Sequence, residues 1–417
     1  MDSCAQRLTV VLDAELRPED AAAELREAGA TRAVVAVRDR PVSSGYLAAL
    51  RRAGAEPFGI EPVALDGRGP EEAQHLLDAA RAKLDALAPD ERGRPRLNGG
   101  ALSRRALFTP GGAVTYAPVA VVDERACAGT AYCGLCVERC PERAIARTSP
   151  APTVDPGACS ACGLCVPACP SGALRLAGSA TAQSEAQLSA LVGKVEGVVL
   201  ACRDGHASAP SGWALVELPT LALVTAGWAL QLRAHGLAVR AVPCDDERCA
   251  AVAGALALAD RVPAESAQEP LCLTEPRATA AIAGRAGGTD VIESDASPLG
   301  VVSFDATGCT LCGACATACP TAALCLEEDS EETALRLRPG TCVACGRCTA
   351  ACPERVLGVR RGIDLGGLRR ESLELAWAPA ETCDSCGATL PPRPMRRRLG
   401  LPDDVCAPCA ARAAQDY

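Results

Sequence analysis

Aromatic residues are scarce in this sequence, with three Trp, four Tyr and three Phe among 417 residues. The hydrophobic core must therefore be built from Ala, Val and Leu, and an aromatic platform for stacking nucleic-acid bases is not expected. Basic residues are outnumbered, 42 Lys and Arg against 51 Asp and Glu, which gives a formal net charge of −9. Because nucleic-acid-binding domains usually carry a basic surface, we expect no nucleic-acid partner.

Long apolar runs and nucleotide-binding motifs are also absent. The most apolar stretch, 214–230, contains Glu217 and Pro219, and its uninterrupted part, 221–230, is much shorter than the roughly 20 residues of a membrane span. No basic segment followed by an apolar run opens the sequence, so we predict no secretory signal and a cytoplasmic location. The motifs GxGxxG, GxxxxGKS/T and HExxH do not occur.

Cysteine, by contrast, is abundant, with 26 residues in the chain. Without an export signal, so many cysteines indicate metal ligands rather than disulfides. Sixteen of them fall into four runs of similar spacing, two in each half of the chain. The runs are Cys127-x5-Cys133-x2-Cys136-x3-Cys140-Pro141, Cys159-x2-Cys162-x2-Cys165-x3-Cys169-Pro170, Cys309-x2-Cys312-x2-Cys315-x3-Cys319-Pro320 and Cys342-x2-Cys345-x2-Cys348-x3-Cys352-Pro353.

Three of these runs match Cys-x2-Cys-x2-Cys-x3-Cys-Pro, and the blocks 127–170 and 309–353 each resemble a bacterial two-cluster [4Fe–4S] ferredoxin. The resemblance implies four [4Fe–4S] clusters, with the fourth cysteine of each run serving the cluster of the other run. The implied ligand sets are Cys127, Cys133, Cys136 and Cys169 for cluster one; Cys159, Cys162, Cys165 and Cys140 for cluster two; Cys309, Cys312, Cys315 and Cys352 for cluster three; and Cys342, Cys345, Cys348 and Cys319 for cluster four.

The first run departs from the pattern, because three extra residues separate Cys127 from Cys133. If Cys127 reaches its cluster through this longer loop, cluster one is a cubane; if it does not, cluster one is [3Fe–4S]. Structural zinc is the alternative for all four runs, but three cysteines at x2-x2 spacing fit one tetrahedral ion poorly. We also expect the proline after each run to open a short helix, where its missing N–H costs nothing.

A different spacing, Cys383-x2-Cys386-x19-Cys406-x2-Cys409, lies near the C-terminus. Two knuckles at this distance match a zinc site and predict a zinc ribbon or treble clef. The same four thiolates would also accept iron in a rubredoxin-like site. We expect one zinc ion here, because a closed four-cysteine site in a short tail usually serves folding.

Two segments outside the cysteine blocks predict small parallel α/β sheets. In the first, strands are expected at 8–12 and 33–37, and helices at 18–28, 43–53 and 70–87. In the second, strands are expected at 195–202 and 238–243, and a helix at 221–234. The predicted fold class is α/β plus α+β. The predicted boundaries are 1–92 for an N-terminal α/β domain, 93–122 for a linker, 123–178 for ferredoxin module 1, 179–298 for a central α/β domain, 299–362 for ferredoxin module 2 and 363–417 for the zinc-binding tail.

The central segment holds four further cysteines, of which Cys202, Cys244 and Cys249 lie at or near predicted strand ends. Cys202 and Cys244 end its two predicted strands, and Cys249 follows five residues later, so parallel strand ends bring them to one edge. This segment resembles the delta iron–sulfur subunit of methyl-viologen-reducing hydrogenases, which couples to heterodisulfide reductase. The resemblance implies a [2Fe–2S] cluster on such cysteines. Here only three thiolates are available, and Thr220 follows Pro219 where the family often has cysteine, so a degenerate docking domain is the alternative.

The motifs together predict a polyferredoxin that passes single electrons between a donor and an acceptor oxidoreductase. The central resemblance favours a hydrogenase, a formate dehydrogenase or a heterodisulfide-reductase-like complex as the partner. No flavin, NAD or organic substrate site is recognisable, so any enzymatic activity would belong to the complex. The alternatives are a non-redox assembly or scaffold protein with structural clusters, and a reductase with a site at Cys202, Cys244 and Cys249.

Overall fold

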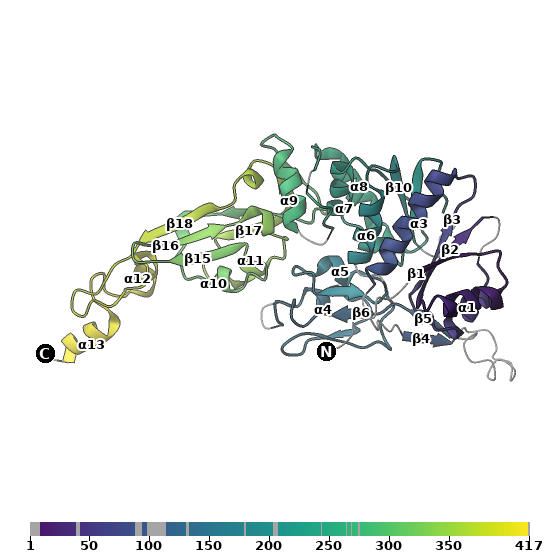
Figure 1. Cartoon of the computed structure of the whole chain (residues 1–417). Coiled ribbons are helices and arrows are strands. Elements are labelled where there is room, and N and C mark those ends of the chain that lie inside the picture. Colours follow the sequence, from purple (N-terminus) through teal and green to yellow (C-terminus); the bar gives the residue numbers. More distant parts are fainter. Residues whose placement is uncertain are drawn as a thin grey trace. The chain divides into compact units, whose positions relative to one another are not determined.

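The computed structural model divides the chain into two compact units (Figure 1). Unit 1 comprises Met1–Cys127, Cys136–Ala257 and Ser266–Glu275, and unit 2 comprises Ala128–Leu135, Leu258–Glu265 and Pro276–Tyr417. Among the described residues, no helix is both long and apolar enough to cross a membrane. The described residues are 9–38, 42–87, 94–97, 114–130, 133–178, 181–202, 207–242, 244–263, 265–267, 269–273 and 276–415.

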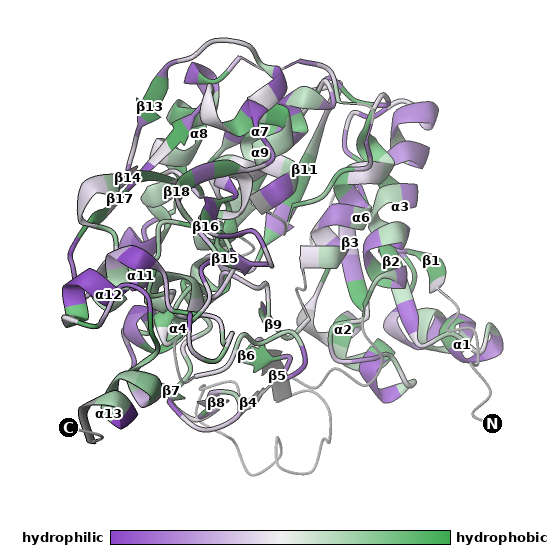
Figure 2. Ribbon diagram, turned by 90° about the vertical axis from the view of Figure 1, so that its left-hand side faces the viewer, coloured by the Kyte–Doolittle hydropathy of each residue, from purple (hydrophilic) through white to green (hydrophobic). Residues whose placement is uncertain are grey.

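Unit 1 begins with a parallel sheet of three strands in the order β1 (Thr9–Asp13), β2 (Arg32–Val37) and β3 (Ile60–Ala64). The helices α1 (Pro18–Glu27), α2 (Ser44–Arg52) and α3 (Pro70–Asp85) connect and follow these strands, as predicted, and α1 is coloured mainly as hydrophilic (Figure 2). The strand β3, whose segment contains Glu61 and Pro62, was not predicted.

The central strand β2 packs on both faces because consecutive side chains point to opposite sides of a sheet. Val35 lies in one core with Leu25 of α1 and Leu50 of α2, whereas Val34 packs against Ala80 and Leu84 of α3. The helices α1 and α2 therefore cover one face of the sheet and α3 covers the other.

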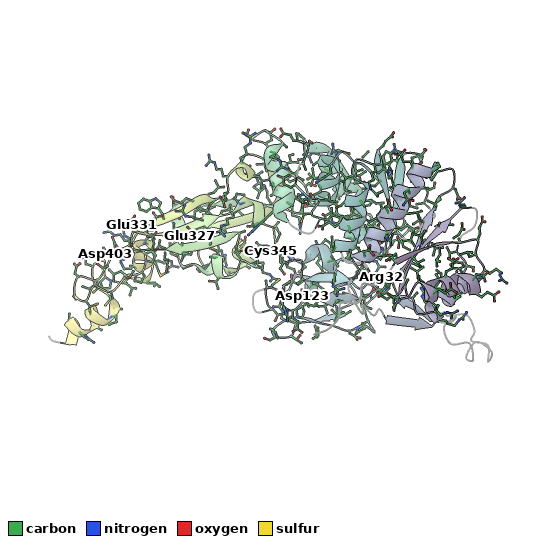
Figure 3. All side chains as sticks on the ribbon, viewed as in Figure 1. Arg32, Asp123, Glu327, Glu331, Cys345 and Asp403 are labelled. Carbon is green, nitrogen blue, oxygen red and sulfur yellow. The ribbon has the colours of Figure 1, made fainter. Side chains whose placement is uncertain are left out.

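Arg32 ties the start of β2 to the end of α3. Its side chain is 3 % exposed, and its guanidinium donates to the carbonyl oxygens of Leu84 and Leu87, the latter at 2.9 Å. Arg32 is labelled in Figure 3. A cation at this position satisfies backbone carbonyls that have no partner inside the helix.

A second parallel sheet in unit 1 has β10 (Gly197–Cys202) between β11 (Trp213–Leu218) and β12 (Ala238–Ala241). All six residues of β10 are buried, as expected for a central parallel strand. The strand β11 was not predicted. The surrounding helices are α6 (Thr181–Leu191), α7 (Ala226–Ala234) and α8 (Ala251–Arg261).

The helix predicted at 221–234 is shorter in the structure. A single 3₁₀ turn, η2 (Leu221–Leu223), comes first, and α7 starts only at Ala226. The Thr220 hydroxyl accepts a hydrogen bond from the N–H of Ala222, which caps η2. This break places residues 220–221 beside the end of β10, where Cys202 lies.

The two α/β segments, interpreted above as separate domains, share one hydrophobic core. Leu76 and Ala79 of α3 belong to the same buried cluster as Leu188 and Leu191 of α6, and the two helices lie side by side (Figure 1). The ammonium of Lys83 pairs with Glu61 and also donates to the carbonyl of Glu217 on β11 at 3.4 Å. Both charged side chains of this pair are buried.

The first ferredoxin-like block in unit 1 has two short antiparallel pairs. The strand β6 (Ala120–Val122) pairs with β9 (Leu174–Leu176), and β7 (Ile145–Ala146) pairs with β8 (Thr153–Val154). The short helices are α4 (Leu135–Arg139) and α5 (Cys165–Ala168).

The interpretation of 93–122 as a linker needs correction, because three strands lie in it. The strands β4 (Arg94–Leu97) and β5 (Val114–Ala117) pair antiparallel, and β6 belongs to the ferredoxin-like block. Residues 98–113 of this stretch lie outside the described residues. These strands were not predicted because each has only three or four residues and the surrounding sequence is rich in Gly, Pro and Arg.

Unit 2 contains two antiparallel sheets around the second cysteine block. One has the order β13 (Val291–Glu293), β17 (Leu357–Asp364) and β14 (Gly300–Phe304), and the other has the order β15 (Leu324–Glu328), β16 (Glu332–Leu337) and β18 (Leu373–Pro379). The helices α10 (Ala314–Thr317) and α11 (Arg347–Ala351) lie within the cysteine runs.

The predicted boundaries of module 2, 299 and 362, are both too narrow. The helix α9 (Pro276–Arg285) packs on η5 (Pro339–Thr341) and η6 (Gly367–Arg369), and β13 pairs with β17, so the continuous part of unit 2 begins at Pro276. On the other side β18, expected in the zinc-binding tail, is the third strand of the sheet with β16.

The prolines do not open helices, which corrects another expectation. In unit 2, α10 ends before Cys319 and Pro320, and α11 ends before Cys352 and Pro353. Proline lacks the N–H and its ring clashes with the preceding turn, so each proline prevents the helix from continuing. The helix therefore stops before the fourth cysteine.

The shared core generates the first prediction. Leu188 is fully buried on α6, and Leu188→Ala should lower the free energy of unfolding of unit 1 by about 2–5 kcal/mol through the cavity it creates. Hydrogen exchange should accelerate in both β10 and the distant strand β2. Leu399→Ala, at a position 63 % exposed, is the control and should leave both strands unchanged. Acceleration confined to the central sheet would show two independently folding domains.

Candidate metal centres

A cavity in unit 1 is lined by four cysteines from two different runs. Cys159, Cys162 and Cys165 come from the second run, and Cys140 is the last cysteine of the first run. The remaining lining is mainly apolar. It includes Ala120, Ala144, Ile145, Gly163 and Leu176.

Unit 2 has two such cavities, and each again combines both runs. One is lined by Cys309, Cys312, Cys315 and Cys352, and the other by Cys319, Cys342, Cys345 and Cys348. Cys319 therefore lies with the second run although only three residues separate it from Cys315. Cys315 sits inside α10, whereas Cys319 follows the end of that helix, so their side chains reach different cavities. Cys345 is labelled in Figure 3.

The first two cysteines of each regular run are joined by a strained turn. The residue before the second cysteine has a positive φ although it is not glycine, at +61° for Ala161, +56° for Leu311 and +53° for Ala344. Such a conformation costs on the order of 1–3 kcal/mol and is concentrated at functional sites. In one of these turns the N–H of Leu311 donates to Cys309 Sγ at 3.4 Å.

A second repeated turn follows each fourth cysteine that lines a cavity. The third residue after the cysteine has a φ of +53° at Arg143, +51° at Ala322 and +56° at Arg355. The next N–H donates to the cysteine sulfur, from Ala144 to Cys140 and from Ala323 to Cys319, both at 3.2 Å. These donors are backbone N–H groups, which every residue type except proline carries, so the sequence does not predict them.

Burial controls the protonation of these thiols. It raises the pKa of Cys165, Cys315 and Cys342 to about 12 in each case. Without metal the three groups are therefore neutral thiols at pH 7, which avoids placing an unpaired charge in an apolar cavity. Because a metal binds the thiolate, metal binding at these sites must release protons.

Cluster one is the least defined of the predicted sites. Cys136 and Cys169 pack in the apolar core of the first block with Ile145 and Leu174. Residues 131 and 132, in the insertion before Cys133, lie outside the described residues. Cys127 and Cys133 remain candidate ligands because of their place in the sequence.

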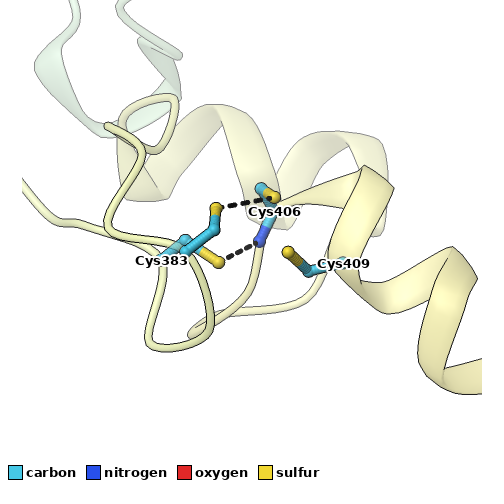
Figure 4. Close-up of side chains that lie close together, drawn as sticks. Cys383, Cys406 and Cys409 are labelled. Carbon is cyan, nitrogen blue, oxygen red and sulfur yellow. Dashed lines mark hydrogen bonds between the residues drawn. The ribbon is translucent and has the colours of Figure 1, made fainter.

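The four cysteines of the C-terminal tail come together around one point. All their Sγ atoms lie within 4.8 Å of one another, and those of Cys386 and Cys406 are 3.7 Å apart. Four thiolates at ~2.3 Å from a single tetrahedral ion would be separated by ~3.8 Å. Figure 4 shows the sulfur atoms of Cys383, Cys406 and Cys409 directed toward a common space.

Two kinds of backbone hold the tail site. The first knuckle is a tight turn in which Gly387, at a φ of +71°, donates to the carbonyl of Cys383 at 2.8 Å. The second pair lies at the start of α13 (Ala407–Gln415). The N–H of Cys406 donates to Cys383 Sγ at 3.2 Å, and this bond, with further hydrogen bonds, lowers the pKa of Cys383 to about 6.

The three central cysteines also converge, as their places at strand ends predict. Cys202 Sγ lies 3.3 Å from Cys244 Sγ and 3.6 Å from Cys249 Sγ. The N–H of Leu221 donates to Cys202 Sγ at 3.3 Å, and the Thr220 hydroxyl lies 3.4 Å from Cys249 Sγ. Burial, together with the hydrogen bond to Cys244, raises the pKa of Cys202 to about 12.

Comparison with known families bears on both cysteine blocks. Residues 301–356 match a family model described as a 4Fe-4S dicluster domain, and residues 152–175 match a 4Fe-4S binding domain. No curated protein matches the chain. The prediction of ferredoxin-type [4Fe–4S] domains is thus confirmed, within a mixed α/β protein.

The second prediction follows from the two cavities of unit 2, each of which is lined by cysteines of both runs. Cys319→Ala should expose Cys342, Cys345 and Cys348 to alkylation in the folded, anaerobically prepared protein, because all four line one cavity. Cys309, Cys312 and Cys352 should stay protected. Cys325→Ala, on the neighbouring strand β15, is the matched control and should expose none of them. Exposure of Cys309 and Cys312 instead would mean that Cys319 serves the site of its own run.

Proposed function

We propose that this protein is a polyferredoxin-type electron-transfer protein that carries four [4Fe–4S] clusters and passes single electrons between partner oxidoreductases. The observation that carries the proposal is the composition of the cavities, each of which takes three cysteines from one run and the fourth from the other. Two-cluster ferredoxins use their cysteines in this crossed arrangement.

The spacing of the thiols supports cubanes over single ions at these cavities. Among the described residues, the groups of at least three ligand atoms within 4.8 Å are those of the tail and of the central cysteines. The cysteines of the four runs are more widely spread. Such spreading is required when each thiolate binds a different iron of one cluster.

The ligands proposed for clusters two, three and four are the cysteines that line the three cavities, and cluster one would use Cys127, Cys133, Cys136 and Cys169. If Cys127 is not a ligand, cluster one is [3Fe–4S]. A bound cluster supplies reversible one-electron chemistry. The chain's own residues hold the thiolates, exclude water with side chains such as Phe304, Leu326 and Leu335, and donate backbone N–H groups to sulfur. Those donors stabilise the more negative reduced state.

For the tail we propose one structural zinc ion on Cys383, Cys386, Cys406 and Cys409. The support is the spacing of the four sulfurs, which is close to that expected around one tetrahedral ion. The rubredoxin-like alternative would place iron on the same four residues.

The partners we propose are a donor and an acceptor oxidoreductase in the cytoplasm, of the hydrogenase, formate dehydrogenase or heterodisulfide-reductase-like class. The support is the resemblance of the central segment to the delta iron–sulfur subunit of methyl-viologen-reducing hydrogenases. The parallel sheet with cysteines at its strand ends is consistent with that resemblance.

The third prediction concerns metal content. Anaerobically purified protein should contain about sixteen iron atoms and about one zinc ion per chain, with sulfide equal to iron. Cys406→Ser should remove the zinc and leave the iron unchanged, because the tail cysteines form a separate site. Fewer than about eight irons would contradict the four-cluster proposal. Zinc replaced by one further iron would assign the tail to the rubredoxin-like alternative.

The fourth prediction separates electron transfer from a scaffold role. Stepwise reduction with dithionite under argon should produce paramagnetic [4Fe–4S]⁺ signals, and an added one-electron acceptor dye should reoxidise them with the iron content unchanged. The measurement is electron paramagnetic resonance at controlled potential. A full iron content without any reducible cluster would contradict electron transfer and favour structural clusters.

A further inference from the structure

Three thiols that the ferredoxin runs do not use meet at one end of the central sheet. Cys202 ends β10, Cys244 follows β12, and Cys249 ends the short turn η3 (Glu247–Cys249). Cys202 and Cys249 are buried, whereas Cys244 is half-exposed. Cys202 Sγ lies 3.3 Å from Cys244 Sγ and 3.6 Å from Cys249 Sγ.

These thiols lie beside the cavity of the second run, within the same unit. A Cβ atom on Gly163, between Cys162 and Cys165, would lie only 2.7 Å from Thr220 Cγ2, so this backbone is in direct contact with Thr220. The Thr220 hydroxyl in turn lies 3.4 Å from Cys249 Sγ, and the next N–H, of Leu221, donates to Cys202.

A second contact joins the two sites from the other side. Arg248, the residue before Cys249, donates from Nη1 to the hydroxyl of Ser160 at 3.2 Å. Ser160 lies between Cys159 and Cys162. Asp246 fixes the guanidinium through hydrogen bonds of 2.7 to 3.0 Å. Both contacts therefore connect the central thiols to the turn that carries cysteines of the second run.

The arrangement of the three thiols does not suit a cluster. A [2Fe–2S] cluster needs two pairs of ligands on two separate irons, whereas among the described residues three sulfurs lie within 4.8 Å of one another, and Thr220, whose hydroxyl lies 3.4 Å from Cys249 Sγ, is not a thiol. A disulfide, by contrast, needs two sulfurs that can approach to ~2.05 Å, and the sulfurs of Cys202, at the end of β10, and Cys244, just after β12, lie 3.3 Å apart.

We propose that Cys202 and Cys244 form a redox-active disulfide that is reduced by electrons from the neighbouring site of Cys140, Cys159, Cys162 and Cys165. The inference rests on the proposed function, because that site must hold a reducible cluster. Cys249 remains a thiol, held by Thr220. Reduction of this disulfide takes two electrons, whereas reduction of one [4Fe–4S] cluster takes one.

The chemistry balances as a two-electron, two-proton reduction. The Cys202–Cys244 S–S bond would break on accepting two electrons one after the other, and each sulfur would take up one proton from solvent. Cys140, Cys159, Cys162 and Cys165 would hold the group that supplies these electrons. The electrons come from the donor protein, or from dithionite in the test tube. The half-exposed Cys244 is the sulfur open to exchange with a disulfide of a partner.

The test counts thiols in the intact protein before and after reduction. Anaerobic protein is treated with diamide or with dithionite, quenched by unfolding in iodoacetamide, and digested for mass spectrometry. We expect Cys202 and Cys244 to be linked after diamide and both alkylated after dithionite. Cys249→Ser should keep this behaviour, whereas Cys202→Ser should leave Cys244 alkylated in both states. Cys325→Ser is the control and should change nothing.

Cys159→Ser tests whether the cluster delivers the electrons. We first measure the time that dithionite needs to reduce the Cys202–Cys244 disulfide fully in the unsubstituted protein. After the same time, the disulfide should still be intact in Cys159→Ser. Alkylation of Cys202 and Cys244 in both states, or loss of a bound metal from Cys202→Ser, would overturn the disulfide while leaving the ferredoxin proposal intact. A protein without reducible iron would instead overturn the proposed function itself.

Discussion

The rest of the structure depends on the fact that the fourth cysteine of a run lies with the other run. Because α10 ends before Cys319, that side chain leaves the cavity of Cys315 and reaches the cavity of Cys342. Neither cavity of unit 2 can therefore be completed by one run alone. The two antiparallel sheets supply the apolar walls, and the cysteines provide the links between them.

An apolar cavity favours the neutral thiol, whereas a metal binds the thiolate. Backbone N–H groups that donate to sulfur stabilise the thiolate in such a cavity. Burial keeps Cys315 and Cys342 protonated when no metal is present, since their pKa is raised to about 12. Thiolates bound to iron share their charge with the metal, and the N–H groups of Leu311 and Ala323 donate to cysteine sulfurs. The strained, positive φ of Leu311 accompanies the hydrogen bond from its N–H to Cys309 Sγ, in the turn between the first two cysteines of the run.

Cysteine spacing predicted the ferredoxin-type domains, and buried apolar runs predicted β2 and β10, because both signals are local. The strand β3 was missed because Glu61 and Pro62 interrupt its pattern; Glu61 is buried and pairs with Lys83, 22 residues away. The boundary at 298 was wrong because β13 gains its partner, β17, from a distant part of the chain. The core shared by Leu76 and Leu188 was likewise not predicted, because no local sequence pattern indicates that α3 packs against α6.

Element-specific anomalous diffraction from anaerobically grown crystals tests the central claim most directly. Data collected at the iron and zinc absorption edges locate each metal and identify its ligands. The crossed arrangement predicts iron in the three described cavities, with Cys140, Cys319 and Cys352 each bound to the cluster of the other run, and zinc only in the tail. Zinc in the cavities, or one cluster bound by both Cys315 and Cys319, would contradict this account.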